Sequence, residues 1–162
     1  MTTQGGKDTG RTNDLELAIT REFSAPAGEV YRAWTDGGIL AKWSAPRDFT
    51  ISHAGGDIRV GGAWRVTMIA PDGTEHRAAG TYRELTAGVR IVMTHGWTGE
   101  DGRPEHETTV SIRFIPADGE RTRMEFAQGI FASKESRDGH AGGWSQCFDK
   151  LEEIFKEALG GR

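Results

Sequence analysis

The sequence predicts an α+β fold in which a curved antiparallel sheet wraps around one long C-terminal helix. The first observation is a helical repeat of apolar residues that starts at Trp144 and continues to Leu159. The second is a succession of alternating apolar and polar stretches between residues 15 and 131, separated by turn signals, which is typical of antiparallel strands. Because each pattern has one apolar face, the helix and the sheet are expected to bury these faces against each other.

The first strand is expected over residues 15–24, where apolar and polar side chains alternate. Two short helices follow this strand. The first begins at Pro26, because the fixed φ of proline suits the first turn of a helix, and it continues to Trp34. Gly37 and Gly38 break it, and a second short helix covers residues 39–43. These two helices connect the first strand to the hairpins.

A run of hairpins follows the two short helices. Turn signals such as Pro71-Asp72-Gly73, Ala87-Gly88 and Asp118-Gly119 separate stretches in which bulky residues occupy every second position. The expected strands cover residues 49–58, 64–68, the stretch from the turn at 71–73 to Leu85, 89–97, 106–114 and 124–130. This order of elements indicates antiparallel pairing and agrees with the α+β class.

The last helix is expected from apolar residues at intervals of three and four positions, which form one buried face. They are Trp144, Cys147, Phe148, Leu151, Ile154, Phe155, Ala158 and Leu159. Three glycines precede this face, at positions 139, 142 and 143, and each costs about 1 kcal/mol of helix stability relative to alanine. We therefore expect residues 133–143 to be a loosened opening of the helix, with room for a bound molecule.

Length and composition restrict the class of protein. The 162 residues fit one domain, expected over residues 14–160 after a disordered leader at 1–13. The net charge of −4 disfavours a nucleic-acid partner. No apolar run approaches the roughly 20 residues that a membrane-spanning helix needs. Without a signal-type apolar stretch, and with Cys147 as the one cysteine, we expect a cytoplasmic protein with a buried structural thiol.

Several segments together resemble those of a known family. They are Phe23-Ser24-Ala25-Pro26, Val30-Tyr31-Arg32-Ala33-Trp34-Thr35-Asp36, Trp43, Val60-Gly61-Gly62-Ala63-Trp64, Gly80-Thr81-Tyr82-Arg83-Glu84-Leu85, Thr94-His95-Gly96-Trp97, His106-Glu107-Thr108-Thr109-Val110 and Asp138-Gly139-His140-Ala141-Gly142-Gly143-Trp144. On these residues, and over about 15–159, the chain resembles the activator of heat-shock protein 90 ATPase homologue-like family. That family lies within the START-like superfamily, often called SRPBCC.

The resemblance implies a helix-grip fold, also described as START-like or Bet v 1-like, with a ligand cavity between the sheet and the C-terminal helix. It does not specify an activity, because the superfamily includes binders, transporters and enzymes. It is compatible with a homodimer, which no sequence feature here specifies. Many relatives carry a Trp-Trp pair where this chain has Trp43-Ser44. If the second ring lines the cavity in relatives, Ser44 enlarges or wets the cavity of this chain.

Polar residues are expected to gather at one end of this cavity. Alternation places His95 on the inward face of its strand, and a hairpin would bring it opposite His106, or opposite Glu107 if the register shifts by one. Gln128 is in phase with the inward residues of the last strand, and His140 lies in the glycine-rich opening. One interpretation is a cluster that orients a polar group of an apolar ligand. The other is a set of rim residues satisfied by one another, by backbone and by water.

Aromatic and methionine side chains in the middle of the inward runs are the candidate lining residues. They are Trp64, Met68, Tyr82, Met93, Trp97, Phe126 and Trp144. Any single ring is more often a core residue than a ligand contact. Methionines adapt to ligands of varied shape, which makes the two in this set plausible contacts.

Three functions follow from these residues. The leading hypothesis is a protein that binds a small apolar or amphipathic molecule, with no cofactor. The second is a protein-interaction module that resembles the chaperone-activating domain and has a chaperone partner. The third is an enzyme in which His95 with Glu107, or His140, moves protons on a bound aromatic or polyketide-like ligand. No nucleophile elbow supports a catalytic triad. No tight His or Cys spacing supports a zinc site, so no metal is expected.

Overall fold

The computed structural model describes residues 14–99 and 101–160, so the leader expected at 1–13 lies outside the described residues. Its elements, in chain order, are β1 (Leu17–Phe23), α1 (Ala27–Thr35), α2 (Gly37–Trp43), β2 (Thr50–Gly56), β3 (Ala63–Ile69), β4 (Glu75–Thr86), β5 (Arg90–Trp97), β6 (Thr108–Ala117), β7 (Arg121–Gly129) and α3 (Lys134–Gly160). The predicted order of a strand, two short helices, a run of strands and one long helix is confirmed.

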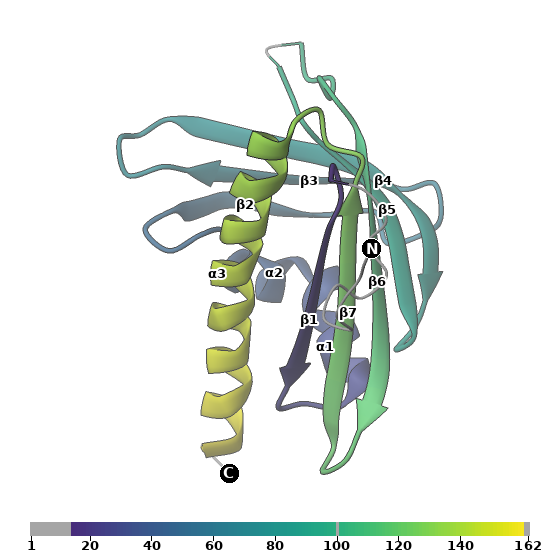
Figure 1. Cartoon of the computed structure of the whole chain (residues 1–162). Helices are drawn as coiled ribbons and strands as arrows, with labels where there is room; N and C mark the ends of the chain where they lie inside the picture. Colours follow the sequence, from purple (N-terminus) through teal and green to yellow (C-terminus); the bar gives the residue numbers. More distant parts are fainter. Residues whose placement is uncertain (1–13, 100, 161–162) are drawn as a thin grey trace.

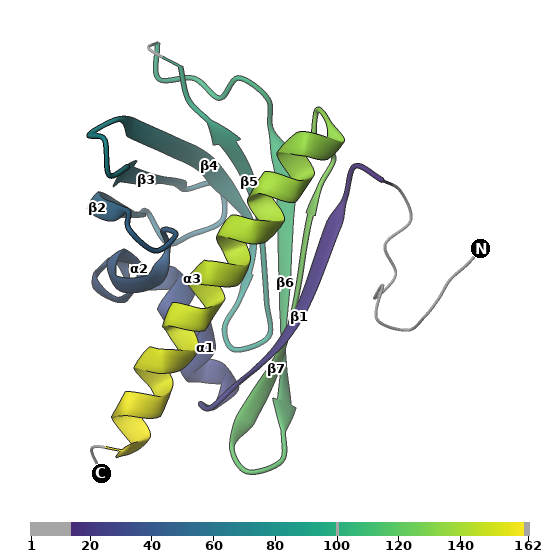
Figure 2. The same ribbon diagram turned by 60° about the vertical axis from the view of Figure 1, so that its left-hand side comes forward.

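In the described part of the chain, the strands form one antiparallel sheet in the order β1-β7-β6-β5-β4-β3-β2. Figure 1 shows this sheet curving around α3, and Figure 2 shows α1 and α2 beside α3 on the same face. Register shifts interrupt the ladder between Ile51 and His53 in β2 and between Tyr82 and Glu84 in β4. Such bulges increase the local twist of a strand and so help the sheet to curl. The predicted helix-grip fold is confirmed.

Helix α3 begins earlier than expected, because the glycine-rich segment is itself helical from Lys134. Ser133 accounts for this start: its Oγ accepts a hydrogen bond from the backbone N–H of Ser136 at 3.0 Å, as an N-cap residue does. The prediction of a loosened opening was wrong in this respect. Helix α3 is long, but no helix in the described ranges is both long and apolar enough to cross a membrane.

The C-terminal half of α3 supplies the centre of the core. Its buried residues are Cys147, Phe148, Leu151 and Phe155. Phe148 is fully buried, and its ring centroid lies 6.3 Å from that of Phe23 in β1, 6.1 Å from Trp34 in α1 and 5.4 Å from Phe126 in β7. One side chain therefore joins α3 to the first strand, the first short helix and the last strand.

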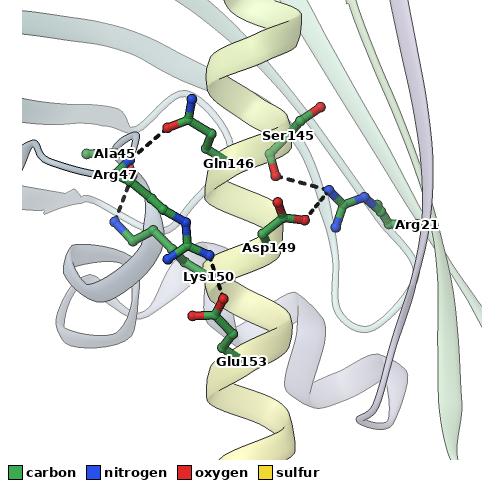
Figure 3. Close-up of polar contacts among 8 residues, drawn as sticks. All are labelled: Arg21, Ala45, Arg47, Ser145, Gln146, Asp149, Lys150 and Glu153. Carbon is green, nitrogen blue, oxygen red and sulfur yellow. Dashed lines mark hydrogen bonds and ion pairs between the residues drawn. The ribbon is translucent and has the colours of Figure 1, made fainter.

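Polar contacts hold α3 from two opposite sides, as Figure 3 shows. On one side Arg21 of β1 donates to the Ser145 carbonyl at 3.0 Å and to the Asp149 carboxylate at 2.6 Å. On the other side lies the segment that follows α2. Lys150 donates to the Ala45 carbonyl at 2.8 Å. On the same side, Arg47 forms an ion pair with Glu153, and its backbone N–H donates a hydrogen bond to the Gln146 side chain.

The β5–β6 hairpin differs from its predicted register. His95 pairs with Thr108, not with His106 or Glu107. The reason is that β6 begins only at Thr108, because the preceding loop closes early through a bridge between Thr98 and Pro104. His106 and Glu107 are consequently exposed loop residues.

Removal of the Phe148 ring is expected to destabilise the whole fold. We expect Phe148→Ala to cost about 3–5 kcal/mol of unfolding free energy, because a cavity opens among rings that cannot collapse onto it. Urea denaturation followed by circular dichroism measures this loss. Lys156→Ala, an exposed change on the same helix, is the control and should change the stability by less than about 0.5 kcal/mol. Similar values for both variants would contradict this account of the core.

Candidate functional site

A cavity of about 350 Å³ lies between the sheet and the first half of α3. Three neighbouring strands supply one wall, with Trp64, Val66 and Met68 from β3, His76, Ala78 and Tyr82 from β4, and Met93, His95 and Trp97 from β5. Figure 2 shows these strands facing the first turns of α3. The volume lies at the lower end of the range of roughly 300–1,000 Å³ for small-molecule sites, which suits one compact ligand.

The helical wall has a sequence pattern of its own. Its residues are Ser136, Gly139, His140, Gly143, Trp144 and Cys147, and they recur at the three- and four-residue spacing of one helix face. Gly139, Gly143 and Ser136 carry little or no side chain, so the helix leaves space between itself and the strands. The glycines that disfavour the helix therefore help to form the cavity.

The rest of the wall comes from α1, α2 and the segment after α2, with Trp34, Leu40, Ser44, Pro46 and Phe49. Ser44 lies in the wall as its position next to Trp43 suggested, and its hydroxyl is buried with no hydrogen-bond partner. No Asp, Glu, Lys or Arg is present among the described residues that form the cavity wall. A charged ligand group would therefore lack a counter-charge there, which is costly in an apolar site.

His95 is a deeply buried polar side chain of the wall, with 6% of its surface exposed. Its ring is surrounded by those of Trp64, Trp97, His140 and Trp144, at centroid distances of 5.4, 5.6, 5.8 and 6.2 Å. Burial, followed by the electrostatic effect of the adjacent His140 ring, lowers the pKa of His95 to about 3. His95 is therefore a neutral imidazole at neutral pH.

His140 has both ring nitrogens engaged. Nε2 accepts a hydrogen bond from the indole Nε1–H of Trp97 at 2.9 Å, and Nδ1 lies 2.7 Å from the carbonyl oxygen of Ser136. A carbonyl only accepts, so Nδ1 carries the proton and the ring is neutral. Burial lowers the pKa of His140, while the bond to Ser136 acts in the opposite direction. His140 therefore fixes the Trp97 ring in the wall.

A chain of buried hydrogen bonds links the helical wall to β5. Trp144 Nε1–H donates to Gln128 Oε1 at 2.8 Å, and Gln128 Nε2–H donates to Thr108 Oγ1 at 2.9 Å. The Thr108 hydroxyl then donates to the backbone carbonyl of His95 at 3.1 Å. Every donor in this chain has an acceptor, so the network can hold Trp144 and His95 in position without an unpaired buried group.

Trp64 is oriented by a similar contact across a strand. Its Nε1–H donates to the Thr94 carbonyl at 3.0 Å. Gly80 of β4 lies between them, and a Cβ there would approach the Thr94 oxygen to 1.9 Å and Trp64 Nε1 to 2.7 Å. Only glycine leaves the passage that this indole needs to reach β5.

The structure brings together eight of the twelve predicted site residues. Those in the cavity wall are Trp64, Met68, Tyr82, Met93, His95, Trp97, His140 and Trp144. Phe126 and Gln128 lie behind the wall: Phe126 packs on Trp144 at a centroid distance of 4.9 Å, and Gln128 is occupied by the hydrogen-bond chain. His106 and Glu107 are displaced by the register of the hairpin.

Sequence reasoning missed several wall residues. His76 was not among the predicted site residues, yet it contributes to the cavity wall, with its ring 6.3 Å from Trp97. Phe49 was placed in a strand but precedes β2. Ser136, Gly139 and Gly143 could have been found from their shared helix face, had the glycine segment been interpreted as helical.

A second cavity of about 90 Å³ adjoins the first and shares His95, Trp97, Ser136 and His140 with it. His106 lies in its wall with Glu105 and Thr108. The His106 ring is not free, because Nε2 is 2.8 Å from the Ile130 carbonyl. His95 therefore borders two spaces, of which only the smaller has a carboxylate in its wall.

Neither a metal centre nor a reactive thiol emerges from the described residues. No three His, Cys, Asp or Glu side chains within ranges 14–99 and 101–160 are arranged to hold a metal ion. Burial raises the pKa of Cys147 to about 12, against the smaller opposing effect of Lys150. Its thiol is therefore protonated and unreactive at neutral pH.

Comparison with known proteins identifies the family. A sequence model described as "Activator of Hsp90 ATPase homolog 1-like protein" matches residues 24–156. The chain belongs to this family. The predicted resemblance is thus confirmed, and the matched range includes every described residue of the cavity wall. A comparison with curated proteins gives no match.

Solved structures of similar proteins share the fold of this chain. A protein from Nitrosomonas europaea is 26% identical, with a TM-score of 0.77 over 93% of this chain and 99% of the other. A protein from Chromobacterium violaceum is 28% identical, with a TM-score of 0.77 over 88% and 98%. A Silicibacter pomeroyi protein named AHSA1 is 22% identical, with a TM-score of 0.77 over 90% and 99%, and shows the fold alone.

Loss of the Gln128 amide, which lies behind the cavity wall, should lower the free energy of unfolding. Gln128→Leu leaves the Trp144 indole N–H without its acceptor, and we expect a cost of about 1–3 kcal/mol in unfolding free energy. Urea denaturation measures this cost. The matched change Gln146→Leu also removes one acceptor, for the backbone N–H of Arg47, but this amide is exposed and water can replace it, so it should cost less than about 1 kcal/mol. Equal costs would show that the buried chain has no special role.

The stability of the protein should depend on His95 in mildly acidic solution. Because the pKa of His95 is about 3 in the folded state and about 6.5 in the unfolded state, only the unfolded chain takes up this proton between those values. The contribution of this pKa difference to the free energy of unfolding is fully present above pH 6.5. It is lost as the pH falls toward 3, by roughly 1 kcal/mol per pH unit.

This effect can be isolated by comparing the wild type with His95→Phe. The stability of the wild type relative to the variant should fall as the pH is lowered from 6.5 to 4, and should be constant above pH 7. Chemical denaturation at several pH values measures both curves. A constant difference across the whole range would mean that His95 takes up a proton in the folded state.

Proposed function

We propose that this protein binds one compact, uncharged and largely apolar small molecule in the cavity between the sheet and the first half of α3. The observation that carries the proposal is the composition of the cavity. Its wall combines aromatic and aliphatic side chains with a few polar groups and, among the described residues, no charged side chain. That combination is the usual form of a small-molecule site.

The packing around the cavity supports a functional rather than an accidental space. The two halves of α3 differ: the second half fills its face with Phe148, Leu151 and Phe155, whereas the first half presents Gly139 and Gly143 to the strands. Each glycine costs about 1 kcal/mol of helix stability relative to alanine. An alanine would satisfy the helix better, so the space is maintained at the expense of stability.

The two other hypotheses have less support. For proton transfer, His95 is a weak base with a pKa of about 3, and both nitrogens of His140 are engaged. For a chaperone partner, the family description names an Hsp90 activator, but the exposed large apolar side chains are dispersed over four segments of the described chain. They are Ile58, Val60, Val89, Ile130 and Leu159.

Three further expectations stay predictions. They are a cytoplasmic location, the organisation of residues 14–160 as a single domain, and a possible homodimer. The proposal does not depend on them, because it rests on the composition of the cavity wall.

Filling the cavity should weaken binding without unfolding the protein. Ala78 lies in the cavity wall, and its neighbour Ala79 does not, since successive side chains of a strand point to opposite faces of the sheet. We expect Ala78→Leu to weaken the binding of the uncharged fluorescent probe N-phenyl-1-naphthylamine roughly 10-fold or more. Its thermal midpoint should be unchanged or higher, because the new side chain fills space.

Ala79→Leu is the matched control on the same strand and should bind the probe like the wild type. Fluorescence titration measures the dissociation constants, and differential scanning fluorimetry measures the midpoints. If Ala78→Leu and Ala79→Leu bind the probe equally well, the cavity is not the binding site and the proposal fails.

A further inference from the structure

The His95 ring is a polar group with an unused hydrogen-bonding position inside an apolar cavity. It is 6% exposed and makes no hydrogen bond to another described residue. The Trp34 indole N–H and the Ser44 hydroxyl of the same wall are also buried without a partner, but they do not provide an imidazole acceptor. The other polar rings nearby are paired. Trp64, Trp144 and His140 each have their ring N–H or nitrogen atoms paired with protein groups.

The position of the proton on the His95 ring determines which ring nitrogen can accept a hydrogen bond from a ligand. The one backbone group that hydrogen-bonds the His95 side chain is its own carbonyl, which lies within reach of Nδ1 and can only accept. Nδ1 therefore carries the proton, and Nε2 is an unpaired acceptor. Burial keeps the ring neutral, so Nε2 stays an acceptor at neutral pH.

An unpaired acceptor in such a place selects for a particular ligand group. A hydroxyl can donate to Nε2, whereas an ether or ketone oxygen cannot. A carboxylate would bring a charge into a wall with no cationic side chain among its described residues, and this is unfavourable without a partner. The rings of Trp34, Trp64, Trp97 and Trp144 around the cavity favour a flat aromatic body, which they can contact edge-to-face or in offset stacks.

We propose that the ligand class of this site is the neutral hydroxylated aromatics, held with the hydroxyl group donating to His95 Nε2. This inference rests on the proposed binding function and specifies its ligand. His95 binds the ligand hydroxyl directly. Gln128 and Thr108 are positioning residues, because their hydrogen-bond chain ends on the His95 carbonyl.

A series of four naphthalene compounds tests the class. Isothermal titration calorimetry at pH 7.5 compares naphthalene, 2-naphthol, 2-methoxynaphthalene and 2-naphthoate. In the wild type, 2-naphthol should bind roughly three- to ten-fold more tightly than naphthalene, the gain expected from one buried hydrogen bond. 2-Methoxynaphthalene should not show this gain, and 2-naphthoate should bind least. Tighter binding of 2-naphthoate or of 2-methoxynaphthalene than of 2-naphthol would overturn the proposed class.

The variant His95→Phe keeps an aromatic ring but removes Nε2. In this variant 2-naphthol should lose its advantage and bind more weakly than naphthalene, since its hydroxyl is then buried unpaired, while the affinity for naphthalene should change little. His53→Phe is the matched control, an exposed histidine outside the cavity wall, and should keep the wild-type preference. An unchanged preference in His95→Phe would overturn the role of His95.

A measurement on the unmodified sequence removes any dependence on the folding of the variant. With ¹⁵N-labelled histidine, the Nε2 signal of His95 should have the shift of an unprotonated nitrogen and should move upfield with 2-naphthol but not with naphthalene. No selective movement, with both compounds bound, would overturn this inference and leave the proposed function intact. Failure of all four compounds to bind would instead count against the proposed function itself.

Discussion

The structure depends on a mismatch of width between one helix and one curved sheet. In the described chain seven strands form the sheet, and strands are spaced about 4.8 Å apart, whereas a helix with its side chains is about 10–12 Å across. Helix α3 alone cannot cover such a face. Curling of the sheet and the two short helices close part of the remaining width, and the cavity is the part that they leave open.

Within this arrangement polar groups are used where apolar packing cannot specify position. A chain of hydrogen bonds runs from Trp144 of α3 through Gln128 of β7 and Thr108 of β6 to the His95 carbonyl of β5. Each donor in this chain has an acceptor. Trp97 is held in the same manner by His140. The aromatic rings of the site are therefore fixed by directional bonds, and the cavity keeps its shape although it lacks side chains to fill it.

The fold was predictable because its signals are local. Alternation of apolar residues and turn signals gave the strands to within a few residues, and the spacing from Trp144 to Leu159 gave the helix. The exceptions have physical causes. The hairpin register depends on a bridge between Thr98 and Pro104, which no alternation pattern encodes. The helical state of the glycine segment depends on the Ser133 cap and on tertiary contact, which override intrinsic propensity.

The site was less predictable than the fold. Residues on inward faces were found, but alternation cannot tell a residue in the wall from one behind it, so Phe126 and Gln128 were grouped with true wall residues such as Met93. The pairing state of each polar group was also hidden: Gln128 and His140 are occupied by protein partners, and His95 is not. That distinction depends on side-chain geometry between strands that are distant in sequence.

The division of α3 into two halves has a consequence for the history of the family. The core residues Phe148, Leu151 and Phe155 follow Trp144, and the small residues Ser136, Gly139 and Gly143 of the cavity wall precede it, so these two sets can change independently. A substitution at Ser136, Gly139 or Gly143 alters the interior without removing a core contact. Proteins only 22–28% identical to this chain keep the same architecture, and such a helix allows their interiors to diverge while the framework is inherited.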